Sequence, residues 1–93
     1  MKARALVAWN LRRLRVERKM AQERLAFDAG IDRSYMSGLE RRIQNPTIDL
    51  LERLAKTLDI PISELFVLPA RGATAPKPLP KGRKILVGKR KKQ

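Results

Sequence analysis

Apolar residues recur at every third or fourth position through the first 68 residues of the chain, which is the period of an α-helix. They are Leu11, Leu14, Leu25, Ala26, Ala29, Met36, Leu39, Ile43, Leu51, Leu54, Ala55 and Leu58. The helical stretches are too short to be stable alone, so their apolar sides must meet in a common core. The sequence therefore predicts an all-α, compact bundle.

The helical pattern is interrupted near Lys19, at Gly30, across residues 44–46 and at Pro61. Glycine and proline are the residues that most often end a helix, because glycine adopts left-handed backbone and proline lacks an N–H. These interruptions predict five helices, over residues 3–19, 22–29, 33–41, 47–58 and 62–67.

The corner at Gly30 separates the second and third of these helices. A left-handed residue costs glycine little, so the chain can turn sharply there. We expect Ile31 to fill the corner and Asp32 to cap the third helix. Thr47 and Ser63 are expected to cap the last two helices in the same way.

Charge divides the chain near Pro69. The whole chain carries 22 Lys and Arg against 9 Asp and Glu, a net charge of +13, which favours a polyanionic partner such as nucleic acid. Residues 1–68 have a net charge of +4, whereas residues 69–93 have +9 and four prolines. We expect a folded domain at 1–68 and a basic tail at 69–93. The tail is either a flexible polycation or contains a short strand, RKILVG, that pairs with its copy in a dimer.

The sequence contains no cysteine and no histidine. This excludes disulfides, thiolate and imidazole catalysis and the usual zinc sites, so neither an enzyme nor a metal or other cofactor is expected. The carboxylates Glu23, Asp28 and Asp32 have no nucleophile motif or phosphate-binding loop to work with. Near the N-terminus only Ala5 to Trp9 form an apolar run, too short for a signal peptide or a membrane span. We expect a cytoplasmic protein.

The stretch QERLAFDAGIDRSYMSGLE, residues 22–40, has apolar or small residues at its fourth, fifth, eighth, tenth, fifteenth and eighteenth positions and glycine at its ninth. This pattern resembles the helix-turn-helix of phage-repressor (Cro/Xre-type) proteins. The resemblance extends over residues 6–66, through LRRLRVERKMAQERLA before the motif and NPTIDLLERLAKTLDIPISELF after it. It implies a repressor-like bundle that binds DNA.

The resemblance also implies a salt bridge, because Arg15 and Glu40 match positions that form an ion pair in the family. Three residues depart from the family pattern. Ala21 replaces the usual Ser or Thr, so the second helix is expected to lack its N-cap. Lys19 and Arg42 stand where glycine is common at a helix end, which is expected to alter those turns.

The third predicted helix, 33–41, has one apolar side with Met36 and Leu39 and one polar side. The residues expected to contact DNA bases are Arg33, Ser34, Ser37, Gly38 and Arg41. Of these, Arg33 and Ser34 match the main base-contacting positions of the family, and arginine can bond a guanine edge with two hydrogen bonds. The residues expected to contact phosphate are Gln22, Tyr35, Arg42 and Asn45. Tyr35 could equally pack sideways, and an ordinary solvated helix would also carry polar residues on this side.

These observations predict a sequence-specific regulator of transcription that binds double-stranded DNA, represses, and acts as a homodimer with helix 33–41 of each copy in a major groove. In the family the dimer contact often involves the region of Leu65, Phe66 and Leu68, and Trp9 is expected in the core or in a subunit contact. One alternative is a DNA-binding antitoxin whose partner is a toxin protein. Another is a non-specific protein that coats DNA through its basic tail.

Overall fold

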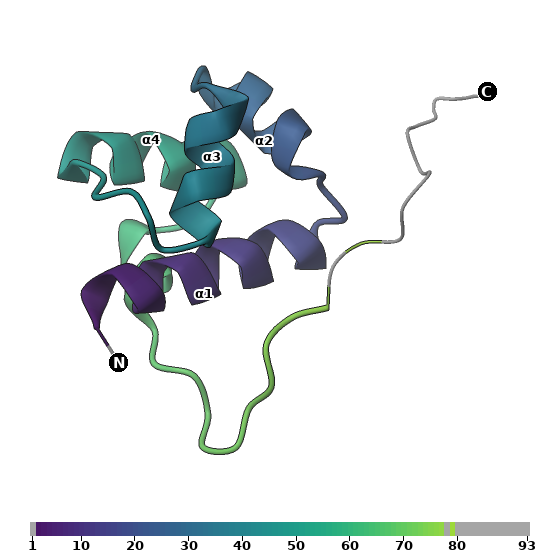
Figure 1. The fold of residues 1–93 in the computed structure, drawn as a ribbon, viewed down its shortest axis with the longest axis vertical. Helices are drawn as coiled ribbons and strands as arrows, with labels where there is room; N and C mark the ends of the chain where they lie inside the picture. Colours follow the sequence, from purple (N-terminus) through teal and green to yellow (C-terminus); the bar gives the residue numbers. More distant parts are fainter. Residues whose placement is uncertain (1, 78, 80–93) are drawn as a thin grey trace.

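The structure, a computed structural model, describes residues 2–77 and 79 and is built from helices (Figure 1). The elements are α1 (Ala3–Glu17), α2 (Gln22–Ala29), α3 (Arg33–Glu40), α4 (Ile48–Leu58) and the 3-10 helix η1 (Ile62–Phe66). Within the described residues there are thus four α-helices and one 3-10 helix, where five α-helices were expected. The expected strand RKILVG lies outside the described residues.

The last element is a 3-10 helix of five residues, where an α-helix over residues 62–67 was expected. It begins after Pro61, and the N–H of Glu64 donates to the carbonyl of Pro61 at 3.0 Å, a bond from residue i+3 to residue i. Ser63 lies inside this element and does not cap it, so that prediction was wrong. The second helix has the expected bounds, whereas the first ends two residues earlier than expected, the third and the last end one residue earlier, and the fourth begins one residue later.

One apolar core joins all five elements, as the apolar period predicted. Its buried members are Val7, Leu11, Leu14, Leu25, Ala26, Ala29, Met36, Leu39, Leu51, Leu54, Ala55, Leu58 and Leu65. Ile43 was expected among them but is 56% exposed. The reason is that α3 ends at Glu40, so the helical period no longer applies at Ile43.

The turns between the helices show how the sequence sets each boundary. Gly30 has φ of 70°, and the Oδ2 atom of Asp32 accepts from the N–H groups of Ser34 and Tyr35 at 2.9 and 3.2 Å, so the expected corner and cap are both present. The hydroxyl of Thr47 accepts from the N–H of Leu50 at 3.0 Å, which confirms the cap of α4. As expected, Ala21 provides no cap to α2.

Lys19 and Arg42 adopt the left-handed backbone that is typical of glycine at a helix end, with φ of 55° and 67°. The expectation that these residues alter the turns is therefore not met, since the backbone stays left-handed. A side chain in this conformation is strained by contact between its Cβ and the following carbonyl oxygen. Asp59, which ends α4, has the same conformation with φ of 59°.

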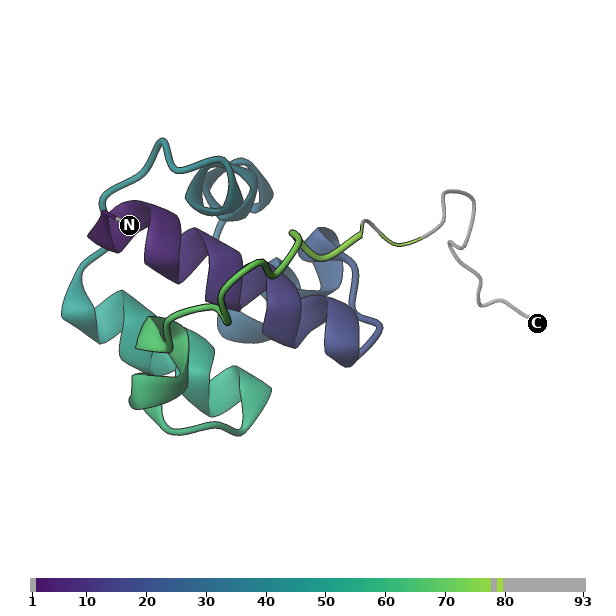
Figure 2. The ribbon, with the colours of Figure 1, turned by 90° about the horizontal axis from the view of Figure 1, so that it is seen from below.

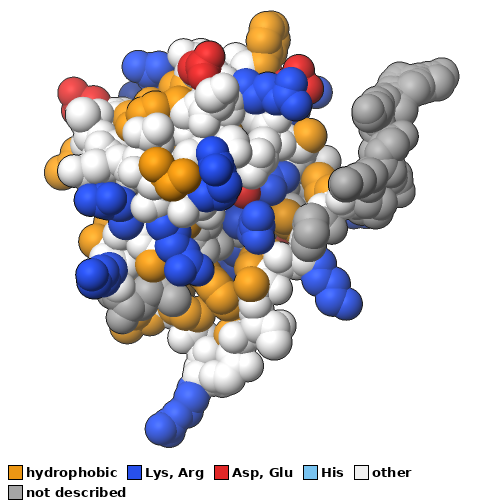
Figure 3. All heavy atoms as spheres, viewed as in Figure 1, with side chains coloured by type: hydrophobic (Ala, Val, Ile, Leu, Met, Phe, Trp, Pro, Cys, Tyr) orange, Lys and Arg blue, Asp and Glu red, His pale blue; other side chains and the backbone are white. Residues whose placement is uncertain are grey.

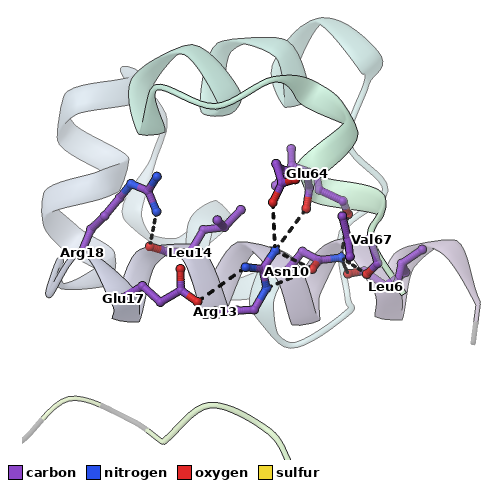
Figure 4. Close-up of polar contacts among 9 residues, drawn as sticks. Leu6, Asn10, Arg13, Leu14, Glu17, Arg18, Glu64 and Val67 are labelled. Atoms are coloured by element: carbon purple, nitrogen blue, oxygen red, sulfur yellow. Dashed lines mark hydrogen bonds and ion pairs between the residues drawn. The ribbon is translucent and has the colours of Figure 1, made fainter. Parts of the chain in front are cut away.

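The buried side-chain amide of Asn10 connects the C-terminal end of the bundle to α1 through hydrogen bonds (Figure 4). Asn10 is 1% exposed, and its Nδ2 lies 3.1 Å from the carbonyl oxygens of Leu6 and Leu65 and 2.8 Å from that of Val67. Its Oδ1 accepts from Nε and Nη2 of Arg13 at 3.2 and 3.1 Å. The chain then runs along α1 through residues 67–77 (Figure 2).

Candidate nucleic-acid interface

The outward face of α3, which we define as Arg33, Ser34, Ser37 and Arg41, lies away from the core. Arg33, Ser34 and Arg41 are exposed and Ser37 is half-buried, whereas Met36 on the opposite side is fully buried. The predicted division of this helix into a polar and an apolar side is therefore present for these residues. Arg41 is the C-cap residue of α3 and immediately follows its last turn.

Gly38 was also expected on this face, but it does not lie there. It is buried, and a Cβ atom placed on it would lie 2.9 Å from Cγ of Gln44. The carbonyl of Gly38 also accepts from the N–H groups of Ile43 and Gln44, at 2.9 and 3.4 Å. Gly38 therefore lets the loop after α3 fold back over the helix, and the side chain of Gln44 covers the glycine.

Below the outward face, Arg15 and Glu40 form the predicted ion pair. Nε of Arg15 lies 2.7 Å from Oε2 of Glu40, and Nη2 lies 3.0 Å from Oε1, so both oxygens are bonded. Both side chains are buried. A third bond runs from Nη1 of Arg15 to the carbonyl of Met20 in the turn before α2. One guanidinium therefore joins α1, the end of α3 and the approach to α2.

Two further side chains bind the same carboxylate. Nε2 of Gln22 donates to Oε1 of Glu40 at 2.9 Å, and Nε of Arg12 lies 3.4 Å from that atom. Burial raises the pKa of Glu40, but the hydrogen bonds from Arg15 and Gln22 and the charges of Arg15 and Arg12 outweigh it, so the pKa is lowered from its ordinary value. Glu40 is thus kept ionised as a carboxylate at the C-terminal end of α3.

Gln22 was expected at a phosphate, and its position qualifies that expectation. The residue begins α2 and is half-buried, with one amide hydrogen committed to Glu40. An amide nitrogen carries two hydrogens, so the second remains available to another acceptor. Sequence reasoning did not foresee the bond to Glu40, because it depends on how α2 and α3 pack.

The remaining predicted contact residues surround the outward face. Asn45 and Arg42 are exposed in the loop after α3. Tyr35 is half-buried and packs against the core, which is the sideways packing that the sequence left open. Nη1 of Arg33 lies 3.8 Å from Oε2 of Glu23, but both side chains are at least 70% exposed, so this ion pair is weak and leaves Arg33 accessible.

The face of the molecule that carries α3 is rich in basic side chains. In Figure 3, Lys and Arg gather over α3 and the N-terminal half of α1. No group of three or more His, Cys, Asp or Glu side chains is placed to hold a metal ion anywhere in residues 2–77 and 79. Over the same residues no helix has the length and apolar character that a membrane crossing requires.

The helix-turn-helix family matches residues 11–65, which is more than half of the chain and includes α2, the Gly30 corner and α3. The chain belongs to the helix-turn-helix family of Cro/Xre-type proteins. It is 40% identical over 65 residues to an HTH-type transcriptional regulator of Sinorhizobium fredii, a match that covers 70% of this chain and 84% of the relative. A hypothetical transcription factor of Neisseria meningitidis is 36% identical over 71% of this chain, and the match spans 62% of that relative.

Solved structures of helix-turn-helix proteins have the same fold. The Neisseria factor superposes with a TM-score of 0.72 over 75% of this chain and 80% of its own, at 34% identity. The restriction-modification controller protein C.Esp1396I, as a tetramer in complex with its natural 35 base-pair operator, gives a TM-score of 0.65 at 35% identity over 71% of this chain and 87% of its own. The helix-turn-helix protein described here therefore shares its fold with a protein whose structure includes operator DNA.

Proposed function

We propose that this helix-turn-helix protein is a sequence-specific regulator of transcription that binds double-stranded DNA in the cytoplasm and represses. The observation that supports this best is the outward face of α3, where Arg33, Ser34 and Arg41 are exposed and no residue is acidic. The buried ion pair between Arg15 and Glu40 holds the end of this helix against α1. A major groove about 12 Å wide admits one α-helix. A rigid attachment of α3 to the bundle keeps the outward face in one orientation, and recognition of DNA bases requires such fixed geometry.

The chemistry of each side chain suggests its role. Arg33 is the first residue of α3 and its side chain is 74% exposed, so its guanidinium can donate to the O6 and N7 atoms of a guanine. Ser34, Ser37 and Arg41 lie along the same face and are secondary base contacts. Gln22, through its second amide hydrogen, Arg42 and Asn45 are assigned to phosphate, where they fix the position of α3 in the groove.

The same proposal includes a homodimer. The C-terminal apolar surface, which we define as Trp9, Phe66, Val67 and Leu68, has Phe66 42%, Val67 43% and Leu68 70% exposed. Trp9, Val67 and Leu68 line one hollow between α1 and residues 67–77. Two copies that meet through this surface would be related by a two-fold axis, as the symmetric half-sites of a DNA operator require.

Dimer formation is tested by the mass of the protein in solution. Leu68→Glu places a charge in the C-terminal apolar surface and should reduce the mass to that of a monomer at micromolar concentration. Ile48→Glu is the matched control, because Ile48 is 74% exposed on α4, outside this surface. A Leu68→Glu protein that keeps the dimer mass would rule out this interface.

Site recognition is tested by selecting bound sequences from random DNA duplexes at stated salt. The wild-type protein should enrich one motif, and Arg33→Ala should lose preference at a single base pair by about 1 to 3 kcal/mol. Lys56→Ala, an exposed change on α4, should leave the motif unaltered. If no motif is enriched, or if Arg33→Ala weakens binding equally on every sequence, the proposal fails.

A further inference from the structure

A second basic surface lies at the start of α1, away from the helix-turn-helix. We call it the N-terminal basic patch and define it as Lys2, Arg4 and Arg42. These three side chains, with Ala3 and Ala5, line one hollow of about 790 Å³ on the surface. All three are exposed, and in the described part of the chain none of them takes part in a salt bridge.

The patch is assembled by tertiary structure, since Arg42 lies far along the chain from Lys2 and Arg4. The left-handed turn at Arg42 leads the chain out of α3 toward the start of α1. In Figures 1 and 2, which are a quarter-turn apart, the loop after α3 lies beside the beginning of α1. No acidic residue occurs in the first turn of α1, so the positive charge is not offset there.

The position of the N-terminal basic patch relative to α3 indicates which strand of a DNA duplex the patch would face. In both views α2 begins on one side of α3, and the loop after α3 and the start of α1 lie on the other. A helix in the major groove has one phosphate backbone on each side of it. With α3 in a major groove, the residues that begin α2 would face one strand and the N-terminal basic patch would face the other.

The other arginines of α1 are less available to bind a DNA strand, because each already bonds another residue of the protein. Arg15 is buried against Glu40, and Arg12 lies 3.4 Å from the same carboxylate. Arg13 is bonded to Asn10 and Glu64 at the C-terminal end of the bundle. The unneutralised charge of α1 in this region therefore belongs to Lys2 and Arg4.

We propose that the N-terminal basic patch binds a backbone phosphate of the DNA strand on the side of α3 opposite to α2. This inference rests on the proposed function. Arg42 and Arg4 would donate to the phosphate oxygens, Lys2 would add a third charge, and the small side chains of Ala3 and Ala5 leave room for the sugar-phosphate chain. The contact carries no base specificity and instead fixes how α3 enters the groove.

The test compares two double variants with the same loss of charge. Lys2→Gln/Arg4→Gln removes the patch residues that no other role requires, and Lys56→Gln/Arg71→Gln removes an exposed Lys and Arg on α4 and in the segment after η1. Binding to the selected site and to a scrambled duplex is titrated over a range of salt concentrations. Each lost phosphate contact should reduce the slope of log affinity against log salt by about 0.9.

We expect the patch variant to lose about one unit of slope and roughly tenfold in affinity on both duplexes, while it keeps its base preference. The control variant should change far less. Equal slopes in the two variants would overturn the proposal. A wild-type protein with no preferred site would overturn the proposed function instead, and the comparison of slopes on the scrambled duplex would still decide the role of the patch.

Phosphates replaced one at a time by uncharged methylphosphonate locate the contact. In the wild-type protein one replacement on the strand opposite α2 should weaken binding, and the same replacement should have a smaller effect on Lys2→Gln/Arg4→Gln, in which only Arg42 of the patch remains. An effect of equal size in both proteins would show that the patch does not touch that phosphate. Circular dichroism of each variant checks that the helices are retained.

Discussion

The guanidinium of Arg15 bonds both carboxylate oxygens of Glu40, at 2.7 and 3.0 Å, between the first helix and the end of α3. Both partners are buried, so neither charge can turn to water if the other is removed. The pair lies under the helix that is proposed to enter DNA. Loss of this ion pair should therefore affect both the stability of the fold and the orientation of the outward face.

Removal of one partner should destabilise the protein strongly. Arg15→Met leaves the Glu40 carboxylate without its main partner, and the free energy of unfolding in urea should fall by about 3 to 5 kcal/mol. The double variant Arg15→Met/Glu40→Met should recover part of this loss, because no buried charge is left unpaired. Arg24→Met serves as a control, since its pair with Asp28 is exposed and should contribute about 0.5 kcal/mol. Equal losses in the two single variants would contradict this assignment.

Stability should also depend on the ionisation of Glu40. Its pKa is lowered in the folded protein from an ordinary value of 4.5, so the unfolded chain takes up a proton at higher pH than the folded one. The stabilisation is complete above the ordinary value and is lost as pH falls through the lowered one. Urea unfolding measured between pH 7 and pH 3 should show this loss, and Glu40→Gln should show a weaker dependence. An unchanged pH profile in Glu40→Gln would assign the effect to other carboxylates.

The contact between Gly38 and Gln44 should appear as coupling between two substitutions. Alanine is favoured over glycine inside a helix by about 1 kcal/mol, but a Cβ on Gly38 would lie 2.9 Å from Cγ of Gln44. We expect Gly38→Ala to stabilise the Gln44→Ala protein by about 1 kcal/mol and to give a smaller gain, or a loss, when Gln44 is present. Four proteins unfolded in urea complete the cycle. Additive effects would mean that Gln44 does not cover the glycine.

The left-handed backbone of Lys19 offers a stabilising substitution. Its φ of 55° strains a residue that has a Cβ, so Lys19→Gly should raise the free energy of unfolding by about 1 kcal/mol. The matched substitution Lys56→Gly, within α4, should lower it by about the same amount. Thermal melts of the two variants should shift in opposite directions. A melt of Lys19→Gly below that of the wild type would show that the turn is not strained.

Deletion of residues 80–93 separates specific binding from coating of DNA. The deletion removes seven Lys and Arg residues and leaves every described element intact. Affinity and the salt slope should both fall, because the number of neutralised phosphates falls. The motif enriched from random duplexes should stay the same, since the outward face of α3 is unchanged. Loss of the motif with the tail would favour the non-specific alternative.

Local features of the sequence determined much of the fold. The corner at Gly30, the caps from Asp32 and Thr47 and the buried stripe of each helix depend on residues within about four positions of one another, so the pattern of residue types predicts them. The Arg15–Glu40 pair was different. It was inferred through the resemblance of the whole pattern to a family, and the structure contains it.

Contacts between distant segments were decided only by the tertiary structure. The helical period placed Ile43 in the core, but the chain leaves α3 at Glu40, and Gln44 then folds back over Gly38. Asn10 offered a weak signal, as a polar residue three positions after the buried Val7, yet two of its three carbonyl partners lie more than fifty residues away.

The proposed phosphate site illustrates the same division. The sequence supplies the charges of Lys2, Arg4 and Arg42. Their convergence on one hollow follows from the angle at which α1 packs beneath α3 and from the turn after α3. The residue types of a segment determine its local structure and its charge. Which side chains from separate helices come together depends instead on how the helices pack, and no single segment encodes that packing.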